Sequence, residues 1–557
     1  MRLLNPHRLR RFNFAKLRKL NLRIPAMIIL ALALAAAGAS YTQRALYTSS
    51  HSTRAFNLGL TETVDKIEPA SIQNYSQRLV SSAVYEGLVC YDESSQTIGP
   101  RLAQSWKYSP DGKTLTVYLR KDVKFSNGKK LTAADVKASF EKNLSNSADW
   151  NTSCLFLPIY GGKEKLNGQG GEIIGIKVLD KHSLAITLVQ PDAAFLASLC
   201  NPIFWVEDPE SGTTPPAGTG PYMLKEIKSS SLQLLRNEYY YRGQPHLSGI
   251  DVTIFPDEDD AYKAYKAGKV DLLNTIPLAE MDSIRKSQKD KALLIEKPVQ
   301  EIYCLGFNMN RDPYVSNYLL RRALNYAIDR ESIIKQLQGD AYIPAKGLLP
   351  AGLEAYNKNI SGYRYDADKA RQLLAQAGYP EGKGLPLLTL TYNDDSGHAV
   401  VAEEVSRQLS EIGVRVQVQP QGWDYFKKQV NSRSLSFFRM SWAADYPDAD
   451  SYLYSLFHSS QIGITNFCGY QNPQVDKILD NSRLKYADPQ ARLQLLRRAE
   501  AIIIDDAPCL WLFQKKAQKL VGQDVRNVKL DCMEMIDWYQ VELLKSDAEK
   551  ANEQKSV

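Results

Sequence analysis

An arginine and an aspartate lie six positions apart in the stretch FFRMSWAADY, residues 437–446, whose other side chains are mostly aromatic, small or apolar. Such side chains usually fold inside a protein, and a charged side chain joins them only when it has a partner. Arg439 and Asp445 are therefore candidates to bind each other or the charged groups of a ligand. Trp442, which lies between them, is either a core residue or part of a wall beside that ligand.

The acidic residues that follow have a simpler explanation. The sequence after Asp445 reads Tyr-Pro-Asp-Ala-Asp, in which Pro447 fixes φ and aspartates favour turns. We therefore predict a turn and assign structural roles to Asp448 and Asp450. Asp445 precedes this turn and belongs to the apolar stretch, which favours a ligand-binding role for it over a place in the turn.

Short motifs of common catalytic or metal sites are absent from the sequence. It contains no GxSxG, HExxH, GxGxxG or GxxxxGK[ST] motif, and its six histidines are dispersed. Seven cysteines without CxxC spacing argue against a zinc ribbon and against a disulfide scaffold, although one or two bridges are possible. We therefore expect no metal, no cofactor and no enzymatic activity.

The positive net charge of +7 is concentrated at the N-terminus. Residues 1–39 contain eight basic side chains and no acidic one, so the rest of the chain has 61 basic and 62 acidic residues. A protein that binds nucleic acid non-specifically needs a basic surface to neutralise phosphates. The balanced charge of the remaining chain argues against such a partner.

The basic N-terminus runs into the apolar stretch IPAMIILALALAAAGA, residues 24–39. A basic region, an apolar region and small residues in this order are typical of a signal peptide, and 16 residues are few for a membrane span. We predict an exported, periplasmic protein with a signal at 1–39. The alternative is an uncleaved anchor that holds the protein at the outer face of the cytoplasmic membrane.

Helix and strand patterns alternate along the chain and predict an α/β protein with mixed sheets. Leu115, Val117 and Leu119 alternate as in a strand, the dipeptide at 127–128 predicts a turn, and Thr132 with Asp135 predicts a helix start. Further helices are predicted up to Gly378 and up to Gly413, the second followed by a strand with Val414, Val416 and Val418. A chain of 557 residues also predicts two or three lobes.

Several longer motifs resemble those of the peptide-binding family of extracytoplasmic solute receptors, which serve ATP-binding-cassette importers. The oligopeptide-binding branch is the most similar one. The resemblance extends over nearly the whole chain after the signal. Its motifs are VYEGLVCYDE (84–93), IGPRLAQSW (98–106), SPDGKTLTVYLRKDVKFSNGKKLTAADVKASF (109–140), GTGPY (218–222), LRRALNYAIDRESI (320–333), NPQVDKI (472–478) and DDAPCLWLF (505–513).

The resemblance implies a class II periplasmic-binding-protein-like fold with three lobes and a two-segment hinge. Two lobes would flank a cleft and close over a ligand, and the third would extend one of them. The implied segments are 54–85, 218–297 and 512–545 for lobe I, 86–217 for lobe II and 298–511 for lobe III. The polar composition of residues 546–557 separately predicts a disordered tail.

The resemblance also implies ligand-binding residues. RMSWAADY is similar to a motif of the oligopeptide-binding branch in which the aspartate, here Asp445, meets the α-ammonium of the peptide. In that motif Trp442 lies beside Asp445 and Arg439 binds the peptide's carboxylate. TYNDDSGH places Asn393 and His398 at the cleft, with His398 near the carboxylate of longer peptides. Trp423 matches the wall of a side-chain pocket.

Each of these residues has an alternative role within the protein. Arg439 can serve as a buried partner of Asp445, His398 can be an exposed residue at a helix start, and Trp423 can be a core aromatic residue. The sequence also departs from the branch at Ala443, where the branch has a cysteine whose partner matches Cys304. We therefore expect no bridge there.

The sequence is thus interpreted as the receptor of an importer for short peptides, which would bind as an extended strand between charged-group contacts at both ends. Its partners would be the permease and ATPase subunits, and we expect a monomer that binds no nucleic acid. Alternatives are a receptor for a nickel chelate, haem, a sugar or an opine, then a regulator and then a hydrolase. A free ammonium group on the ligand would separate peptides from the other solutes.

Overall fold

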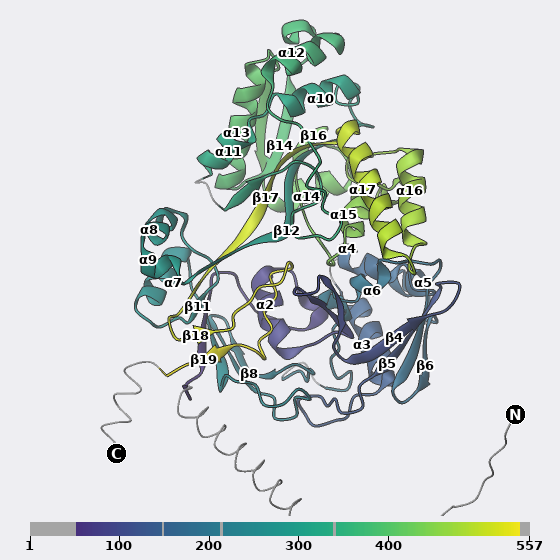
Figure 1. Cartoon of the computed structure of the whole chain (residues 1–557), viewed down its shortest axis with the longest axis vertical. Helices are drawn as coiled ribbons and strands as arrows, with labels where there is room; N and C mark the ends of the chain where they lie inside the picture. Colours follow the sequence, from purple (N-terminus) through teal and green to yellow (C-terminus); the bar gives the residue numbers. More distant parts are fainter. Residues whose placement is uncertain (1–51, 148–149, 212–214, 338–340, 546–557) are drawn as a thin grey trace, which may run out of the picture. The chain divides into compact units, whose positions relative to one another are not determined.

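Figure 1 shows the computed structural model of the chain, which describes residues 52–147, 150–211, 215–337 and 341–545. Residues 54–542 form one of two units in the chain, and the following description concerns that unit. The predicted signal at 1–39 and the predicted tail at 546–557 lie outside the described residues. Across the described residues, none of the helices is both long enough and apolar enough to cross a membrane.

The larger of the main sheets in the described residues has 11 strands with parallel and antiparallel neighbours. The order is β15-β14-β16-β12-β17-β11-β1-β10-β9-β8, and β13 pairs with β17. The strands are β1 (Phe56–Leu60), β8 (Tyr222–Lys228), β9 (Ser231–Arg236), β10 (Gly249–Ile254), β11 (Leu272–Leu273), β12 (Leu294–Phe307), β13 (Tyr342–Pro344), β14 (Leu388–Asn393), β15 (Val416–Gln421), β16 (Phe437–Ala443) and β17 (Cys509–Val521). This mixed sheet confirms the predicted α/β class.

Helices cover both faces of the part of this sheet that contains β14, β16, β12 and β17 (Figure 1). One face packs against α15 (Asp450–Phe457), α16 (Pro473–Arg483) and α17 (Pro489–Asp506). The other face packs against α10 (Tyr318–Tyr326), α11 (Arg330–Gln336), α12 (Ala367–Gln376) and α13 (Ser396–Ser410). The strands are therefore buried between two helical layers.

The side chains of the FFRMSWA segment, which forms strand β16, alternate between these two layers. Successive side chains of a strand point to opposite faces of the sheet. Phe438, Met440 and Trp442 pack in the core beside α15 to α17, whereas Phe437 packs in the core on the other face. Arg439 shares the face of Phe437, because two positions separate them. Arg439 and Trp442 therefore point away from each other.

The two longest strands of the sheet are β12 and β17, which run antiparallel to each other (Figure 1). Their register shifts between Pro298 and Ile302 and again between Tyr303 and Cys304, as at β-bulges. At the first shift the side-chain amide of Gln514 donates a hydrogen bond of 2.9 Å to the carbonyl of Val299. These strands continue without a break through positions 297–298 and 511–512, where lobe boundaries are predicted.

A second sheet, of four strands, confirms the prediction for residues 114–144. Its order is β4 (Ala103–Tyr108), β5 (Thr114–Leu119), β7 (Ser183–Thr187) and β6 (Ile176–Asp180). The predicted inward residues of β5, Leu115, Val117 and Leu119, are buried. Thr132 and Asp135 form a capping box at the start of α3 (Ala133–Asn146). The sheet and α3 share one hydrophobic core.

The two helices predicted to end at glycines are also present. Helix α12 ends two residues before Gly378, and α13 ends three residues before Gly413. Both glycines have positive φ, 96° and 86°, which favours glycine at the end of a helix. The strand after Gly413 begins at Val416, two residues later than the pattern predicts, and Val414 is buried before it.

The cysteines form no bridge in the described residues. All seven lie within the described ranges, and none of them is joined to another by a disulfide bond. Cys304 pairs with Met440 across the sheet, and Ala443 pairs with Glu301. Among the described residues, no group of three His, Cys, Asp or Glu side chains is placed to hold a metal ion.

Glu500, on the inner face of α17, gives a first testable prediction. Only 1% of it is exposed, its Oε1 accepts a hydrogen bond of 2.9 Å from the amide of Leu349, and burial raises its pKa to about 7. The pKa of Glu500 in the folded protein exceeds its value in the unfolded chain. Its contribution to the free energy of unfolding is therefore fully present below pH 4.5 and is lost as the pH rises through 7. We expect the stability of Glu500→Gln relative to the parent to increase by about 2 kcal/mol between pH 5 and pH 8. Urea unfolding at both pH values measures this difference, and equal differences at both would contradict it.

Candidate functional site

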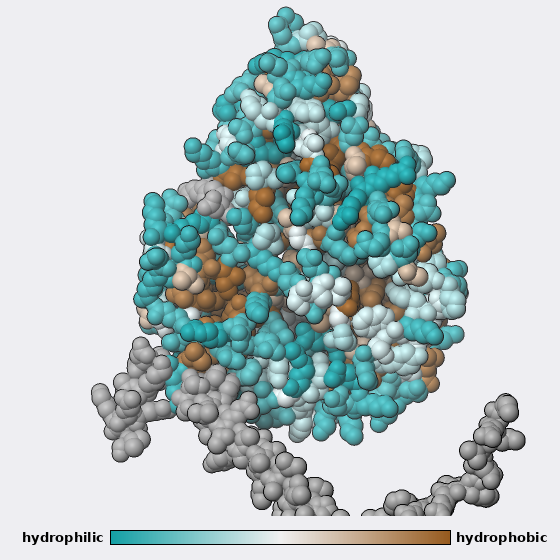
Figure 2. All heavy atoms as spheres, in the orientation of Figure 1, coloured by the Kyte–Doolittle hydropathy of each residue, from teal (hydrophilic) through white to brown (hydrophobic). Residues whose placement is uncertain are grey.

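A cavity of about 970 Å³ lies among segments that are distant in the sequence. Its size is at the upper end of the range of small-molecule sites. The lining residues come from α2 (Tyr75–Val84), the hairpin of β2 (Val89–Asp92) and β3 (Thr97–Pro100), residues 200–205, residues 241–242, the start of β12, residues 528–538, and the turn with Asp445 and Pro447. The molecular face in Figure 2 is mostly hydrophilic, with hydrophobic residues grouped across its middle.

Asp445 lies in the wall of this cavity, and its backbone is held on both sides. Its amide donates a hydrogen bond of 2.9 Å to the Oγ of Ser451, the second residue of α15. Its carbonyl accepts a hydrogen bond of 2.8 Å from the Nδ2 of Asn201, which belongs to the predicted lobe II. These two hydrogen bonds fix the backbone of Asp445 at the edge of the cavity and so restrict the position of its side chain.

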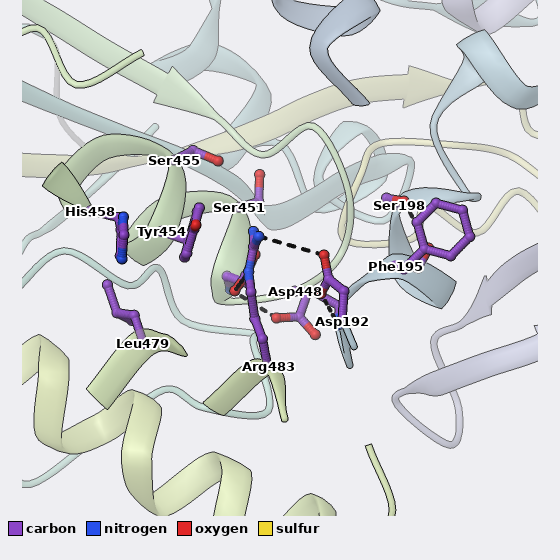
Figure 3. Close-up of polar contacts among 12 residues, drawn as sticks. Asp192, Phe195, Ser198, Asp448, Ser451, Tyr454, Ser455, His458, Leu479 and Arg483 are labelled. Atoms are coloured by element: carbon purple, nitrogen blue, oxygen red, sulfur yellow. Dashed lines mark hydrogen bonds and ion pairs between the residues drawn. The ribbon is translucent and has the colours of Figure 1, made fainter. Parts of the chain in front are cut away.

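The two aspartates assigned to the turn bind arginines of the chain itself. Asp448 accepts two hydrogen bonds of 2.8 Å from Arg492. Asp450 accepts hydrogen bonds of 2.7 and 3.1 Å from Arg483, which also lies 3.5 Å from Asp192 (Figure 3). These ion pairs support the structural roles predicted for Asp448 and Asp450.

The Arg483 cluster joins predicted lobes II and III through charges that are almost fully buried. Burial would raise the pKa of Asp450, but the Arg483 guanidinium outweighs it and holds this pKa below its ordinary value. Burial raises the pKa of Asp192, whose contact with Arg483 is longer. The guanidinium also stacks on the ring of Tyr454, 3.3 Å from its centroid. The contacts of Arg483 with Asp450, Asp192 and Tyr454 therefore hold the turn beside Asp445 in place.

Trp442 is a buried residue of the core beside α15 to α17, with 7% exposure. Its indole N–H donates a hydrogen bond of 2.9 Å to the carbonyl of Ser451. Because the hydroxyl of the same serine binds the amide of Asp445, Trp442 and Asp445 are linked through Ser451. Trp442 itself is not among the residues that line the cavity.

Arg439 and His398 come together around a tyrosine that the sequence analysis did not single out. The Arg439 guanidinium donates to Ser441 at 2.6 Å and lies 5.2 Å from the ring centroid of Tyr303. The hydroxyl of Tyr303 is 3.2 Å from the Nδ1 of His398. The contacts of Arg439 thus lie away from Asp445, and neither Arg439 nor His398 lines the cavity.

The environment of His398 predicts a pH dependence. Burial, with a further contribution from Arg439, lowers the pKa of His398 to about 4, while Asp395, 3.9 Å away, acts in the opposite direction. Because this pKa is below that of the unfolded chain, the folded protein loses stability as the pH falls from about 6.5 towards 4.

Between pH 8 and pH 5 the free energy of unfolding of the parent should fall. We expect this fall to be about 1–2 kcal/mol smaller in His398→Gln. Urea unfolding across this pH range measures the slope of the free energy of unfolding against pH. An unchanged slope would show that His398 titrates in the folded protein as it does in the unfolded chain.

The two remaining predicted residues lie at neighbouring element ends. Asn393 ends β14 and pairs in register with Gln421 of β15. The side-chain oxygens of both residues are buried and have no hydrogen-bond partner in the described residues. Trp423 begins α14 (Trp423–Asn431), is 54% exposed and has its ring centroid 6.4 Å from that of Phe426. Neither Asn393 nor Trp423 lines the cavity.

Comparisons with known proteins agree with this architecture. A sequence model of the "Bacterial extracellular solute-binding proteins, family 5 Middle" matches residues 97–463. The chain is 30% identical to the haem-binding protein A of Haemophilus influenzae, over 78% of this chain and 82% of that protein. It is 26% identical to the dipeptide-binding protein of Escherichia coli, over 92% of this chain and 97% of that protein.

Solved structures show the same fold. The unliganded open form of MppA, a periplasmic murein tripeptide-binding protein, superposes with a TM-score of 0.76 and 24% identity, over 90% of this chain and 99% of that chain. This superposition confirms the predicted periplasmic-binding-protein fold. The matched sequence model covers more than half of the chain, including the turn with Asp445. The chain therefore belongs to the bacterial extracellular solute-binding proteins of family 5, and it is a solute receptor of an ATP-binding-cassette importer rather than an enzyme.

Proposed function

We propose that the solute is a short peptide and that Asp445 binds its α-ammonium. The observation that carries this proposal is the position of Asp445, in the wall of the 970 Å³ cavity on a backbone held by Ser451 and Asn201. A carboxylate placed in this way suits a ligand that has a free ammonium group. The names of the dipeptide-binding relative and of the murein tripeptide-binding structure support a peptide as the ligand.

Haem is a second candidate solute, because the relative with 30% identity is named as a haem-binding protein. Haem has two carboxylates and no ammonium group, so an aspartate in the cavity wall would not favour it. The two candidate solutes therefore differ in the charge of the group that would lie near Asp445, which is a positive ammonium in a peptide and a negative carboxylate in haem.

Isothermal titration calorimetry with trialanine, N-acetyl-trialanine and haemin tests the proposed function. We expect trialanine to bind, with N-acetylation strongly weakening the interaction. Binding of haemin without binding of either peptide would replace the peptide proposal with the haem alternative.

The predicted lobes are part of the same proposal. The boundaries of lobe III at 298 and 511 fall within β12 and β17, at the first and the second register shift respectively. A two-segment hinge at these positions would let the lobes close on the peptide. Small-angle scattering with and without trialanine measures this closure as a decrease in the radius of gyration. Binding without compaction would contradict the hinge.

We further propose that the protein works in the periplasm, or at the outer face of the cytoplasmic membrane if its N-terminal segment is not cleaved. The basic and apolar order of residues 1–39 supports export. We expect the exported protein to begin near Ser40, and N-terminal sequencing measures this. Intact residues 1–39 on membrane-bound protein would favour the anchored form.

A further inference from the structure

Arg101 differs from Arg321, Arg330, Arg483 and Arg492 in what its guanidinium contacts. It lines the same cavity as Asp445, and its side chain is 21% exposed. The nearest carboxylate oxygens are those of Glu86 at 3.7 Å and Asp537 at 3.9 Å, both beyond hydrogen-bond distance. The thiol of Cys90, a weak acceptor, is a hydrogen-bond partner of Arg101.

Other buried arginines use their donors within the protein. Arg321 donates hydrogen bonds to four backbone carbonyls, and Arg330 donates to several, including those of Trp511 and Tyr363. Arg483 and Arg492 each bind a carboxylate with two hydrogen bonds. A guanidinium has five N–H donors, and a largely buried one normally satisfies them. The donors of Arg101 are therefore placed for an acceptor that enters the cavity.

The two carboxylates near Arg101 are already bound to other groups. The Oε1 of Glu86 accepts a hydrogen bond of 2.8 Å from Tyr240. Asp537 accepts hydrogen bonds of 3.1 and 3.2 Å from Arg242, whose guanidinium also stacks on the ring of Tyr539. The oxygens of Glu86 and Asp537 that lie nearest Arg101 therefore accept shorter hydrogen bonds from Tyr240 and Arg242.

The charge around Arg101 also favours an anion. Arg101, Arg120 and Arg242 line the cavity together with two acidic neighbours, Glu86 and Asp537. Asp122 lies 3.6 Å from Arg120, but it is 61% exposed and outside the cavity lining. Burial raises the pKa of Glu86, while Arg101 acts in the opposite direction. Among these five side chains the three guanidinium groups outnumber the two carboxylates, whereas the whole lining has six basic and seven acidic residues.

We propose that Arg101 binds a carboxylate of the solute, in the cavity where Asp445 binds the ammonium group. Planar guanidinium and carboxylate groups form paired hydrogen bonds, and such bonds are strong in a partly buried site. For a short peptide, this carboxylate is the C-terminal one. The inference rests on the proposed peptide-binding function and adds a second charged contact. The resemblance assigns Arg439 to the peptide's carboxylate and His398 to that of longer peptides, and neither residue lines this cavity.

The experiment compares trialanine with its C-terminal amide on the parent protein and on Arg101→Gln, by calorimetry at pH 7. We expect amidation to weaken binding to the parent by about 10- to 100-fold. On Arg101→Gln, amidation should have little effect, because the variant and the amide each remove the same ion pair. Arg101→Lys, which keeps the charge but not the paired geometry, should give an intermediate loss.

Arg498→Gln, a substitution of an exposed arginine on α17, is the matched control and should bind both ligands as the parent does. Equal binding of trialanine and its amide by the parent would overturn the inference, even if Arg101→Gln fails to fold. So would an equal loss on amidation in the parent and in Arg101→Gln. N-acetylation reports on Asp445 alone, so a loss on acetylation without a loss on amidation would keep the proposed function and reject the carboxylate site. Failure of every trialanine derivative to bind would reject both.

Discussion

Asp445→Asn is expected to weaken the binding of free peptides by about two to three and a half orders of magnitude. In the proposed closed complex the ion pair between Asp445 and the α-ammonium would be taken out of water, and leaving one of its charges unpaired would cost about 3–5 kcal/mol. N-acetylation of the peptide should cause a similar loss on the parent protein. Calorimetry with the parent, Asp445→Asn, trialanine and N-acetyl-trialanine measures all four combinations.

The combined loss should be much smaller than the sum of the two, because both changes remove one ion pair. Asp368→Asn is a suitable control, since the side chain of Asp368 is 97% exposed on α12. The hydrogen bonds of Asp445 to Ser451 and Asn201 use its backbone, so the substitution leaves them in place. Equal affinities of the parent for free and acetylated peptides would reject the assignment of Asp445.

Arg483→Gln should lower the free energy of unfolding by about 3–5 kcal/mol at pH 7. The substitution would leave Asp192 and Asp450, which are 5% and 0% exposed, as buried carboxylates without their cation. Removing one partner of a buried pair is costly because the other charge stays out of water. Urea unfolding of the parent and the variant measures the loss.

The loss should become smaller as the pH falls, because protonation neutralises the two carboxylates in the variant. Arg498→Gln on the neighbouring helix removes an exposed charge and should change stability by less than about 0.5 kcal/mol. A loss below about 1 kcal/mol in Arg483→Gln, or one independent of pH, would show that solvent or other groups already balance these carboxylates.

The sequence predicted those elements whose signals are local. The capping box at Thr132, the alternation of Leu115, Val117 and Leu119, and the glycines at 378 and 413 each act within a few residues. Their physical cause is contained in the segment itself, namely a cap, a face or a backbone conformation. The start of β15 was predicted two residues early, because Val414 is buried before the strand ladder begins.

The candidate site was less predictable, because its geometry depends on which face of a strand each residue occupies. Arg439 and Trp442 are three positions apart, and an odd spacing on a strand places them on opposite faces. Their closeness in the sequence groups both with Asp445, whereas in the structure Arg439 lies with Tyr303 and His398. The strand period of the FFRMSWA segment would have separated them.

The environment of Arg101 could not be read from any one segment. Its neighbours Glu86 and Asp537 are far apart in the chain and meet only in the folded protein. The motif IGPRLAQSW marked Arg101 only as part of a family resemblance. When the partners of an arginine come from distant loops, no local sequence pattern predicts them. The role of such an arginine can be inferred only from its contacts in the folded protein.

The central position of β17 has a consequence for the order of folding. This strand pairs with β11, β12 and β13, and its Gln514 bonds to Val299, 215 residues earlier. The main sheet therefore stays incomplete until nearly the whole chain has been synthesised, and contacts of such sequence separation form slowly. A chain that ends before Cys509 would leave three strands with open edges and would be prone to aggregate. If the chain is exported as proposed, slow closure of this ladder would keep the newly made chain unfolded for longer and thus competent for export.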